Sequence, residues 1–440
     1  MPGLYLNGSI RIVSGALPKA LGCEMVVSMQ LTISVLLGGL ALLLVGVGLL
    51  GTLLGMRATL AGFSNLEIGW IMGGYYAGYL VGTHWGPGII SRVGHIRAFA
   101  AFAALGAACV LAFGLWVTPL AWFALRVING AAVVGVYMVV ESWLNTQTPA
   151  RLRGRVFAAY MITTLLALAL GQYLLLIYAP DRMELFALAT MLIALSVIPV
   201  SVVRVSEPAI EPPSPLRLGT LYAQSPLGAA GALAAGIVNG MFWTMTPVFA
   251  QRLAMSPTEI AVLMSATIAG GALLQYPIGH ISDRYDRRSV LVGVSFAAAL
   301  LAALAGYFVL AEPQGLAVIA FLYGGPMFSL YGISVAHTND HLNAGQILAA
   351  TRGLLLVFGA GAVAGPLLGA WAMELRGPAG LPFLSSIVLG VLGVFGLIRM
   401  LQRPPPPQTE QGGFVPLVRT TPVVLEMYPE TDGTSPDGQD

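Results

Sequence analysis

Charge is scarce in this chain. Only 9% of its 440 residues are Asp, Glu, Lys or Arg, whereas 57% are hydrophobic. The formal net charge of +2 is small and spread along the sequence, so no nucleic-acid partner is expected. The two cysteines, Cys23 and Cys109, are far apart and have no metal-ligand spacing around them. We therefore expect no disulfide framework, no metal site and no cofactor.

Two functional classes lack their sequence signatures. No Walker-type glycine loop occurs and the polar linker described below is too short for a nucleotide-binding domain, which excludes ATP as a driving force. No nucleophile or paired carboxylates lie together at one face of the predicted bundle, so an enzyme is not expected.

Long apolar segments make up most of the sequence. About 20 helical residues cross the hydrocarbon core of a bilayer, and the runs here have that length. Leu, Ala and Gly dominate them without the alternation typical of strands, so we predict an all-α membrane protein with twelve transmembrane helices. The spans are placed near 30–56, 66–90, 96–117, 119–145, 154–178, 183–204, 226–250, 258–281, 288–310, 314–336, 346–372 and 381–401.

Basic residues predict the orientation of these spans. If the N-terminus is cytoplasmic, fifteen Lys and Arg residues fall on the cytoplasmic side and four on the other. By the positive-inside rule, both termini lie in the cytoplasm, and we expect a bacterial inner-membrane protein. Residues 1–27 form a predicted cytoplasmic leader without a removable signal peptide, and Met25 or Met29 is an alternative start.

The sequence divides into two similar halves. A Pro-rich polar linker, 205–225, separates a six-helix bundle at 28–204 from a second at 226–401, and a Pro-rich tail at 402–440 is predicted to be disordered. The segment "SNLEIG" at 64–69 recurs as "SPTEIA" at 256–261, 192 positions later, and both are capping-box patterns.

Gly171-Gln172 likewise aligns with Gly365-Pro366, 194 positions later. Two related six-helix halves form a transporter architecture, because a site between two similar bundles can open to either side as they rock.

One loop concentrates charge between two spans. "GHISDRYDRR", 279–288, places five charged residues within six positions. It resembles the signature loop of the major facilitator superfamily, although Asp286 takes the place of its second glycine. The resemblance covers about 28–401, and "VVESWLN" followed by "RGRVFAAYM" is similar to the YcaD-like branch, whose substrates are largely undefined. The matching positions are Gly279, Ile281, Ser282, Asp283, Arg284, Arg287 and Arg288.

The resemblance implies a cytoplasmic gate. In the family, the Asp lies near a helix N-terminus in the other half and the arginines pair with acidic partners. The alternative is that the loop is only an orientation signal. The corresponding loop of the first half, 87–97, keeps Arg92, Gly94 and Arg97, but has Ser91 in place of the Asp. We expect Glu141 to supply the missing negative charge to Arg97, Arg153 or Arg155.

Ionisable residues within spans are functional candidates, because a bilayer makes them costly. Arg126 resembles the R-x-x-x-G motif of the family's fourth span, which implies proton coupling or substrate binding. Asn129 and Tyr137 share its helix face. Arg352 is a candidate for an anionic substrate. Each arginine has the alternative of reaching the membrane surface.

Polar side chains in other spans are candidate cavity-lining groups. With few charges and several aromatics, such a cavity suits a small neutral or amphipathic solute. The alternative is that they make hydrogen bonds between helices. The candidates are Gln172, Asn239, Trp243, Thr244, Thr246 and Gln275.

The functional prediction is a secondary transporter of a small solute that works by alternating access, with proton coupling left open. It is expected to be a monomer in the lipid bilayer. The alternatives are a membrane sensor or scaffold that does not transport, or a proton-driven drug efflux pump. "GAVAGPLLGA" at 361–370 is similar to an antiporter motif, but the family places that motif in span five, which counts against the efflux pump. "HTNDH" at 337–341 is interpreted as a loop rather than a metal site.

Overall fold

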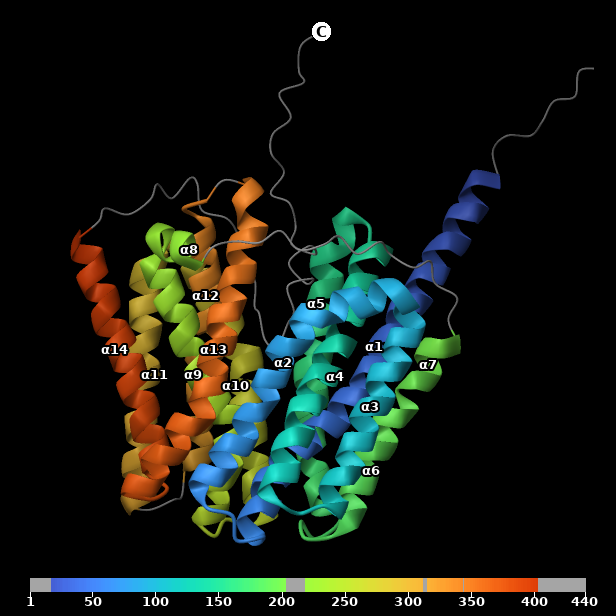
Figure 1. Ribbon diagram of the computed structural model, residues 1–440. Coiled ribbons are helices and arrows are strands. Elements are labelled where there is room, and N and C mark those ends of the chain that lie inside the picture. The colour runs from blue at the N-terminus through green and yellow to red at the C-terminus, as the bar shows by residue number, and fades with distance from the viewer. Residues whose placement is uncertain (1–16, 203–217, 312–314, 343, 403–440) are drawn as a thin grey trace, which may run out of the picture.

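The computed structural model describes residues 17–202, 218–311, 315–342 and 344–402, and this part of the chain is built from helices (Figure 1). The predicted tail at 402–440 lies outside it except for Gln402. The elements of the first half are α1 Leu17–Leu60, α2 Asn65–Val93, α3 His95–Leu115, α4 Pro119–Gln147, the short 3₁₀ helix η1 Ala150–Leu152, α5 Arg153–Tyr173, η2 Leu174–Leu176, α6 Met183–Leu195 and α7 Val197–Val202.

The second half repeats this plan after the short helix α8, and Figure 1 shows the two halves side by side as two bundles. Its elements are α8 Leu218–Gln224, α9 Pro226–Arg252, α10 Pro257–Arg284, α11 Arg287–Ala311, α12 Leu316–Asn339, α13 Ala344–Arg376 and α14 Gly380–Gln402.

Twelve helical spans account for the expected architecture. Eleven segments of the described chain are long and apolar enough to cross a membrane, with α5 joined to η2 and α6 joined to α7. The twelfth, α2, is less apolar because it is rich in Gly and Tyr, but its 29 residues extend about 43 Å and make it as long as its neighbours.

The bundle has two chemically distinct ends. The capping-box end holds the start of α2 and of α10, where the backbone N–H groups of Ser64 and Ser256 donate to Glu67 and Glu259 at 2.8 and 2.7 Å. Both capping boxes are thus confirmed. The opposite, Arg-rich end holds the start of α5 and α11 and both ends of the described chain, at the top of Figure 1.

Glycines bring the helices of each half into backbone contact. A Cβ at Gly78 of α2 would collide with the carbonyl of Val127 of α4, and a Cβ at Gly270 of α10 would collide with the carbonyl of Phe321 of α12. The two contacts are equivalent in the repeat. In a bilayer, where hydrophobic burial does not drive helices together, such close backbone approach stabilises packing through dispersion.

The first and fifth helices of each half are also joined by a glycine that packs on a backbone carbonyl. Gly171 of α5 packs on the carbonyl of Val45 in α1, and Gly365 of α13 packs on the carbonyl of Ile237 in α9. The sequence alignment of Gly171 with Gly365 is therefore matched by their contacts.

Several boundaries differ from the sequence-based expectation. α1 already begins at Leu17, inside the predicted leader, and α8 forms within the predicted linker. The sixth span breaks into α6 and α7 around Ser196, because Pro199 has no N–H to donate to the carbonyl one turn before it. The predicted loop at 337–341 is wrong in part, since α12 continues through Asn339.

The glycine contacts predict that a larger side chain destabilises the protein at Gly270 but not at Gly293. Gly270→Val should lower the free energy of unfolding by about 1–3 kcal/mol or more, because the new side chain meets backbone that cannot move aside. Gly293→Val is the control, since a Cβ there meets nothing within 4 Å. Thermal unfolding of the purified proteins in detergent measures both, and equal melting temperatures for the two variants would contradict the packing argument.

Candidate functional site

A buried ionic network lies at the Arg-rich end of the second half. Nη1 of Arg287, on the first turn of α11, is 2.6 Å from Oδ1 of Asp340 after α12, and Nη2 is 3.2 Å from Asp283 of α10. The side chains of Arg287 and Asp340 are 1% and 2% exposed. The network therefore ties three helices together, and it replaces lost hydration with ion pairs.

A second pair closes the turn between α10 and α11. Asp286 accepts from the backbone N–H of Arg288 at 3.1 Å and from its guanidinium at 3.0 Å, so it caps α11. Burial acts to raise the pKa of Asp286, but the hydrogen bonds and charge of Arg288 outweigh it, and the pKa is lowered. This stabilisation is present above the ordinary pKa of aspartate and is lost only as the pH falls through the lowered value.

Asp286 thus explains the departure from the family loop. The corresponding residue in the first half, Gly94, has a φ of 85°, a left-handed conformation that favours glycine. Asp286 is not among the residues with positive φ in the described chain. The second half therefore uses a side-chain cap where the first half uses a glycine turn.

The predicted partners of the loop arginines are acidic, and the structure places acidic residues beside them. These pairs form within the second half, between α10, α11 and the end of α12. A contact of Asp283 with a helix N-terminus of the first half stays a prediction. Sequence reasoning missed Asp340, because "HTNDH" was interpreted only as a loop rather than a metal site.

The first half has a counterpart of this network without carboxylates. His95, 192 positions before Arg287, begins α3 and is 2% exposed. Its Nε2 lies 3.2 Å from Oγ of Ser142 in a hydrogen bond, and its ring packs on Trp143. Sequence reasoning missed His95, although the 192-residue offset of the capping boxes points to it.

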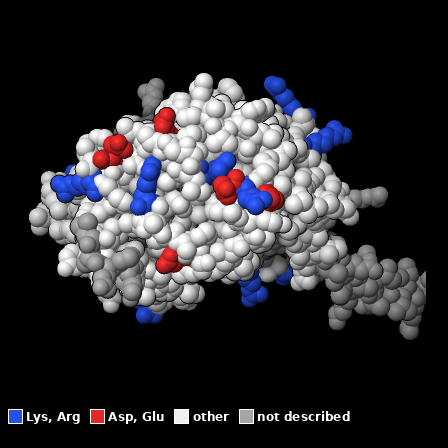
Figure 2. All heavy atoms as spheres, turned by 90° about the horizontal axis from the view of Figure 1, so that it is seen from below, with Lys and Arg blue, Asp and Glu red and all other residues white. Residues whose placement is uncertain are grey.

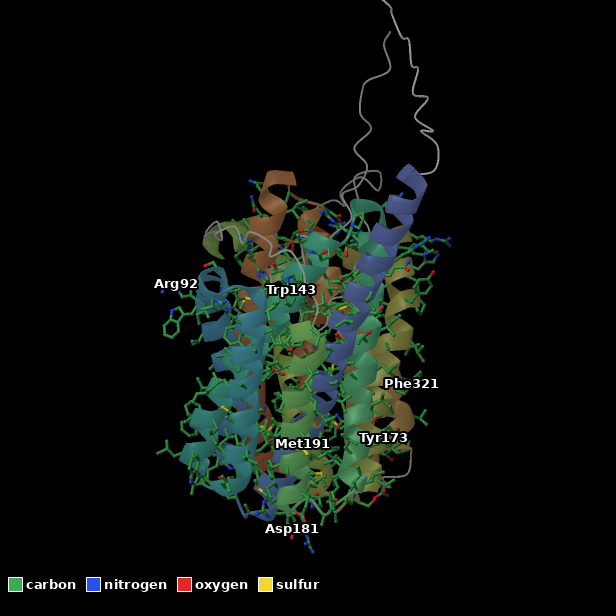
Figure 3. The ribbon with its side chains drawn as sticks, turned by 90° about the vertical axis from the view of Figure 1, so that its right-hand side faces the viewer. Arg92, Trp143, Tyr173, Asp181, Met191 and Phe321 are labelled. Carbon is green, nitrogen blue, oxygen red and sulfur yellow. The ribbon has the colours of Figure 1, made fainter. Side chains whose placement is uncertain are left out.

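The remaining gate candidates lie near the same end. Gly279 is buried in α10, and Arg153 is partly buried. Figure 3 shows Arg92 at the surface near this end, on the opposite end of the bundle from Asp181. The exposed candidates are Arg92, Arg97, Arg155 and Arg284.

Glu141 is fully buried in α4, with 0% of its surface exposed. Oε1 of Glu141 accepts a hydrogen bond from the hydroxyl of Tyr160 on α5 at 2.6 Å. Tyr79 of α2 and Tyr137 of α4 lie close enough to act electrostatically on Tyr160. The structure therefore pairs this carboxylate with a tyrosine of the neighbouring helix, while the predicted pairing with Arg97, Arg153 or Arg155 stays untested.

Arg126 is also buried, near the other end of α4. Only 5% of it is exposed, and its guanidinium carbon lies 4.7 Å from the ring centroid of Tyr75 on α2. This cation–π contact accounts for a charge in the bundle interior. Asn129 lies near Gly106 of α3, so Arg126 and Asn129 contact different helices although they share a broad face.

Two amide candidates bond within or between neighbouring helices. Gln172 donates to the carbonyls of Gly48 and Leu168, each at 3.0 Å, and accepts from Thr52 at 2.5 Å. Asn239 donates to the carbonyl of Ala235 at 2.9 Å. These bonds favour the packing interpretation for Gln172, because both ends of its amide are engaged.

The other candidates occupy different environments. Trp243 packs edge-on against Phe242 and near Phe328. Thr246 lines a mostly apolar cavity of about 80 Å³ inside the second half. Gln275 is 3% exposed, and its amide nitrogen has no hydrogen-bond partner among the described residues. Arg352 is partly buried in α13, and Thr244 donates to the carbonyl of Gly240 at 2.6 Å.

The two halves meet at the capping-box end, which Figure 2 shows as a mostly uncharged face with scattered charges of both signs. Asn65 of α2 donates to Glu374 of α13 at 3.2 Å, and Arg252 at the end of α9 donates to the carbonyl of Phe63 at 3.0 Å. One turn further along α2 from Asn65, Gly69 packs on Ala370 of α13. We call these two hydrogen bonds the capping-box closure.

Several known proteins are similar to this chain in sequence. Residues 228–427 match the family model of the Major Facilitator Superfamily. An uncharacterized MFS-type transporter YcaD from Escherichia fergusonii is 27% identical over 310 residues, covering 70% of this chain and 80% of the relative. The YcaD of Shigella flexneri is 28% identical over 313 residues, covering 71% and 81%. The chain is a membrane transporter whose second half matches the major facilitator superfamily. It resembles the YcaD-like branch.

Solved structures agree on the fold. The nucleoside transporter NupG has a TM-score of 0.65 at 16% identity, with 84% of this chain and 98% of that one covered. A bacterial homolog of the human lysosomal transporter Spinster, inward-facing and unoccupied, has a TM-score of 0.66 at 12% identity, with 84% and 95% covered. The all-α prediction with two six-helix repeats is thus confirmed. The sequence matches to transporters confirm the prediction of a transporter rather than an enzyme.

The buried network predicts that Asp340 is needed for stability. Asp340→Ala should cost about 3–5 kcal/mol, because it leaves the buried guanidinium of Arg287 without its shortest ion pair. The double change Arg287→Met with Asp340→Leu should recover much of this loss, since no charge is then stranded. Thermal unfolding in detergent measures both. A double variant as unstable as the single one would contradict the ion-pair argument.

Proposed function

We propose that this transporter carries a small solute across the bacterial inner membrane by alternating access. The proposal rests on one observation above all. Two halves with equivalent internal contacts meet at the capping-box end through Asn65 with Glu374 and Arg252 with Phe63. A closure at one end, made by bonds between two otherwise rigid bundles, is what a rocking mechanism requires.

The energetics of the closure support reversible opening. A hydrogen bond contributes about 0.5–1.5 kcal/mol net, and the capping-box closure comprises two of them with neighbouring small-residue packing at Gly69. Glycine contacts run along helix pairs within each half, and Gly69, Gly73 and Gly359 make such contacts between α2 and α13 of the two halves. The halves are therefore expected to separate at this end as rigid bodies.

The charge distribution supports a cytoplasmic Arg-rich end. The capping-box end carries Arg57, Arg182, Arg252 and Arg376, whereas the other basic residues in the loops of the described chain belong to the Arg-rich end. The positive-inside rule then places the closure on the far side of the membrane from the cytoplasm. Both chain termini would be cytoplasmic.

The proposed solute is small and neutral or amphipathic. Tyr137 and Arg126 lie on one face of α4, and the interior offers more tyrosine and amide groups than charges. A proton-driven drug efflux pump is the weaker alternative, because α5 reads "TTLLALALGQYLL" and lacks the antiporter motif. A sensor or scaffold on the same fold is the alternative that a transport assay excludes.

Locking the closure should stop transport. In a chain whose Cys23 and Cys109 are replaced by Ser, a bifunctional thiol cross-linker joining Asn65→Cys and Glu374→Cys should abolish solute uptake into liposomes, and a cleavable linker should restore it on reduction. The single Asn65→Cys variant treated in the same way is the control. Full uptake by the cross-linked protein would contradict alternating access at this end.

Solute binding should depend on Arg126. We expect at least one member of a library of small neutral, amphipathic and anionic solutes to raise the melting temperature of the purified protein by mass action. Arg126→Ala should abolish that shift, whereas Arg182→Ala, at an exposed surface position, should keep it. A shift that survives in Arg126→Ala would place Arg126 outside the solute site.

A further inference from the structure

The buried carboxylate of Glu141 is the feature of the interior that packing explains least. It lies in α4 six residues before Gln147, about 9 Å along the helix from the Arg-rich end. Its surface is fully buried, and the hydroxyl of Tyr160 donates to it at 2.6 Å. An ionised carboxylate in such a place loses its hydration, which costs free energy unless hydrogen bonds or a proton compensate.

The duplicated half supplies an internal control for this position. The 194-residue offset that aligns Gly130 with Gly324 and Gly171 with Gly365 aligns Glu141 with Val335 and Tyr160 with Leu354. Val335 and Leu354 are 2% and 0% exposed. The same place in the fold is therefore filled by apolar side chains in the second half, so the architecture does not require an acid there.

Two more tyrosines lie near the Glu141–Tyr160 pair. Tyr137 is one helical turn from Glu141 on α4, and Tyr79 of α2 is close enough to Tyr160 to act on it electrostatically. Tyrosine hydroxyls can donate to a carboxylate and accept from a carboxylic acid, so they serve both protonation states. The basic groups from α2 to α5 toward the Arg-rich end are His84, Arg92, His95, Arg97, Arg151, Arg153 and Arg155.

We propose that Glu141 and Tyr160 form a proton-binding site reached from the Arg-rich end. A proton from water binds the Glu141 carboxylate and makes it a neutral acid, while Tyr160 keeps its own proton and changes from donor toward acceptor. The site removes a buried charge from the interface of α4 and α5. Its use as the coupling site for solute movement rests on the proposed function, but proton binding itself does not.

The test is an infrared titration of the purified wild-type protein in lipid nanodiscs without any solute. Protonation of a buried carboxyl group adds a C=O stretching band whose shift in D₂O is slow compared with that of exposed carboxyl groups. We expect this band in the wild type, its loss in Glu141→Gln, and a displaced band frequency and titration midpoint in Tyr160→Phe. Glu184→Gln, at an exposed position, should leave the band unchanged.

Two outcomes would overturn the proposal. One is a band that persists unchanged in Glu141→Gln, and the other is the absence of a slowly exchanging band at any pH at which the protein stays folded. The double variant Glu141→Val with Tyr160→Leu carries the apolar residues found at the corresponding positions of the second half. It should therefore remain folded and lack the band, which controls for loss of the band through misfolding. A transporter that moves solute without this band would retain the proposed function and lose the proton site.

Discussion

Close backbone contact through glycine is the constraint on which this transporter depends. Hydrophobic burial does not hold helices together inside a bilayer, so packing must come from surfaces that fit at short range. Gly78 against Val127 and Gly270 against Phe321 repeat one such contact, and Gly171 and Gly365 repeat another. Each half is consequently a stiff unit. The halves also meet along α2 and α13, where Gly69 and Gly73 lie against the backbone of Pro366 and Val363, and side-chain bonds add to this contact at the capping-box end.

The two halves use the same geometry with different chemistry. At the Arg-rich end, the second half places Arg287 with Asp283 and Asp340, whereas the first half places His95 with Ser142 in the corresponding position. Deeper in the bundle the asymmetry is reversed, because the first half has the acidic Glu141 where the second half has the apolar Val335 at the corresponding position. A gene-duplicated fold thus offers its own comparison: what both halves share holds the bundle, and what only one half carries is a candidate for function.

Polar groups inside the bundle divide by how completely their hydrogen bonds are used. Both the oxygen and the nitrogen of the Gln172 amide make hydrogen bonds to α1 or to its own helix, so Gln172 is a packing residue. Arg126 finds an aromatic face, and Glu141 finds a tyrosine hydroxyl. The latter two lie about 22 Å apart along one helix, too far for a direct ion pair. Arg126 and the Glu141–Tyr160 pair are therefore buried toward opposite ends of one helix.

The sequence by itself determined the span count, the repeat and the capping boxes, because these depend on local hydropathy and on residues three positions apart. It also predicted that the loop arginines near Asp283 have acidic partners. Only the tertiary structure decided which ones: Asp340 is 53 residues from Arg287 and becomes its partner because α11 and α12 pack together. The pairing of Glu141 with Tyr160 and of Asn65 with Glu374 has the same origin, since helix packing, not spacing along the chain, brings those side chains within hydrogen-bond distance.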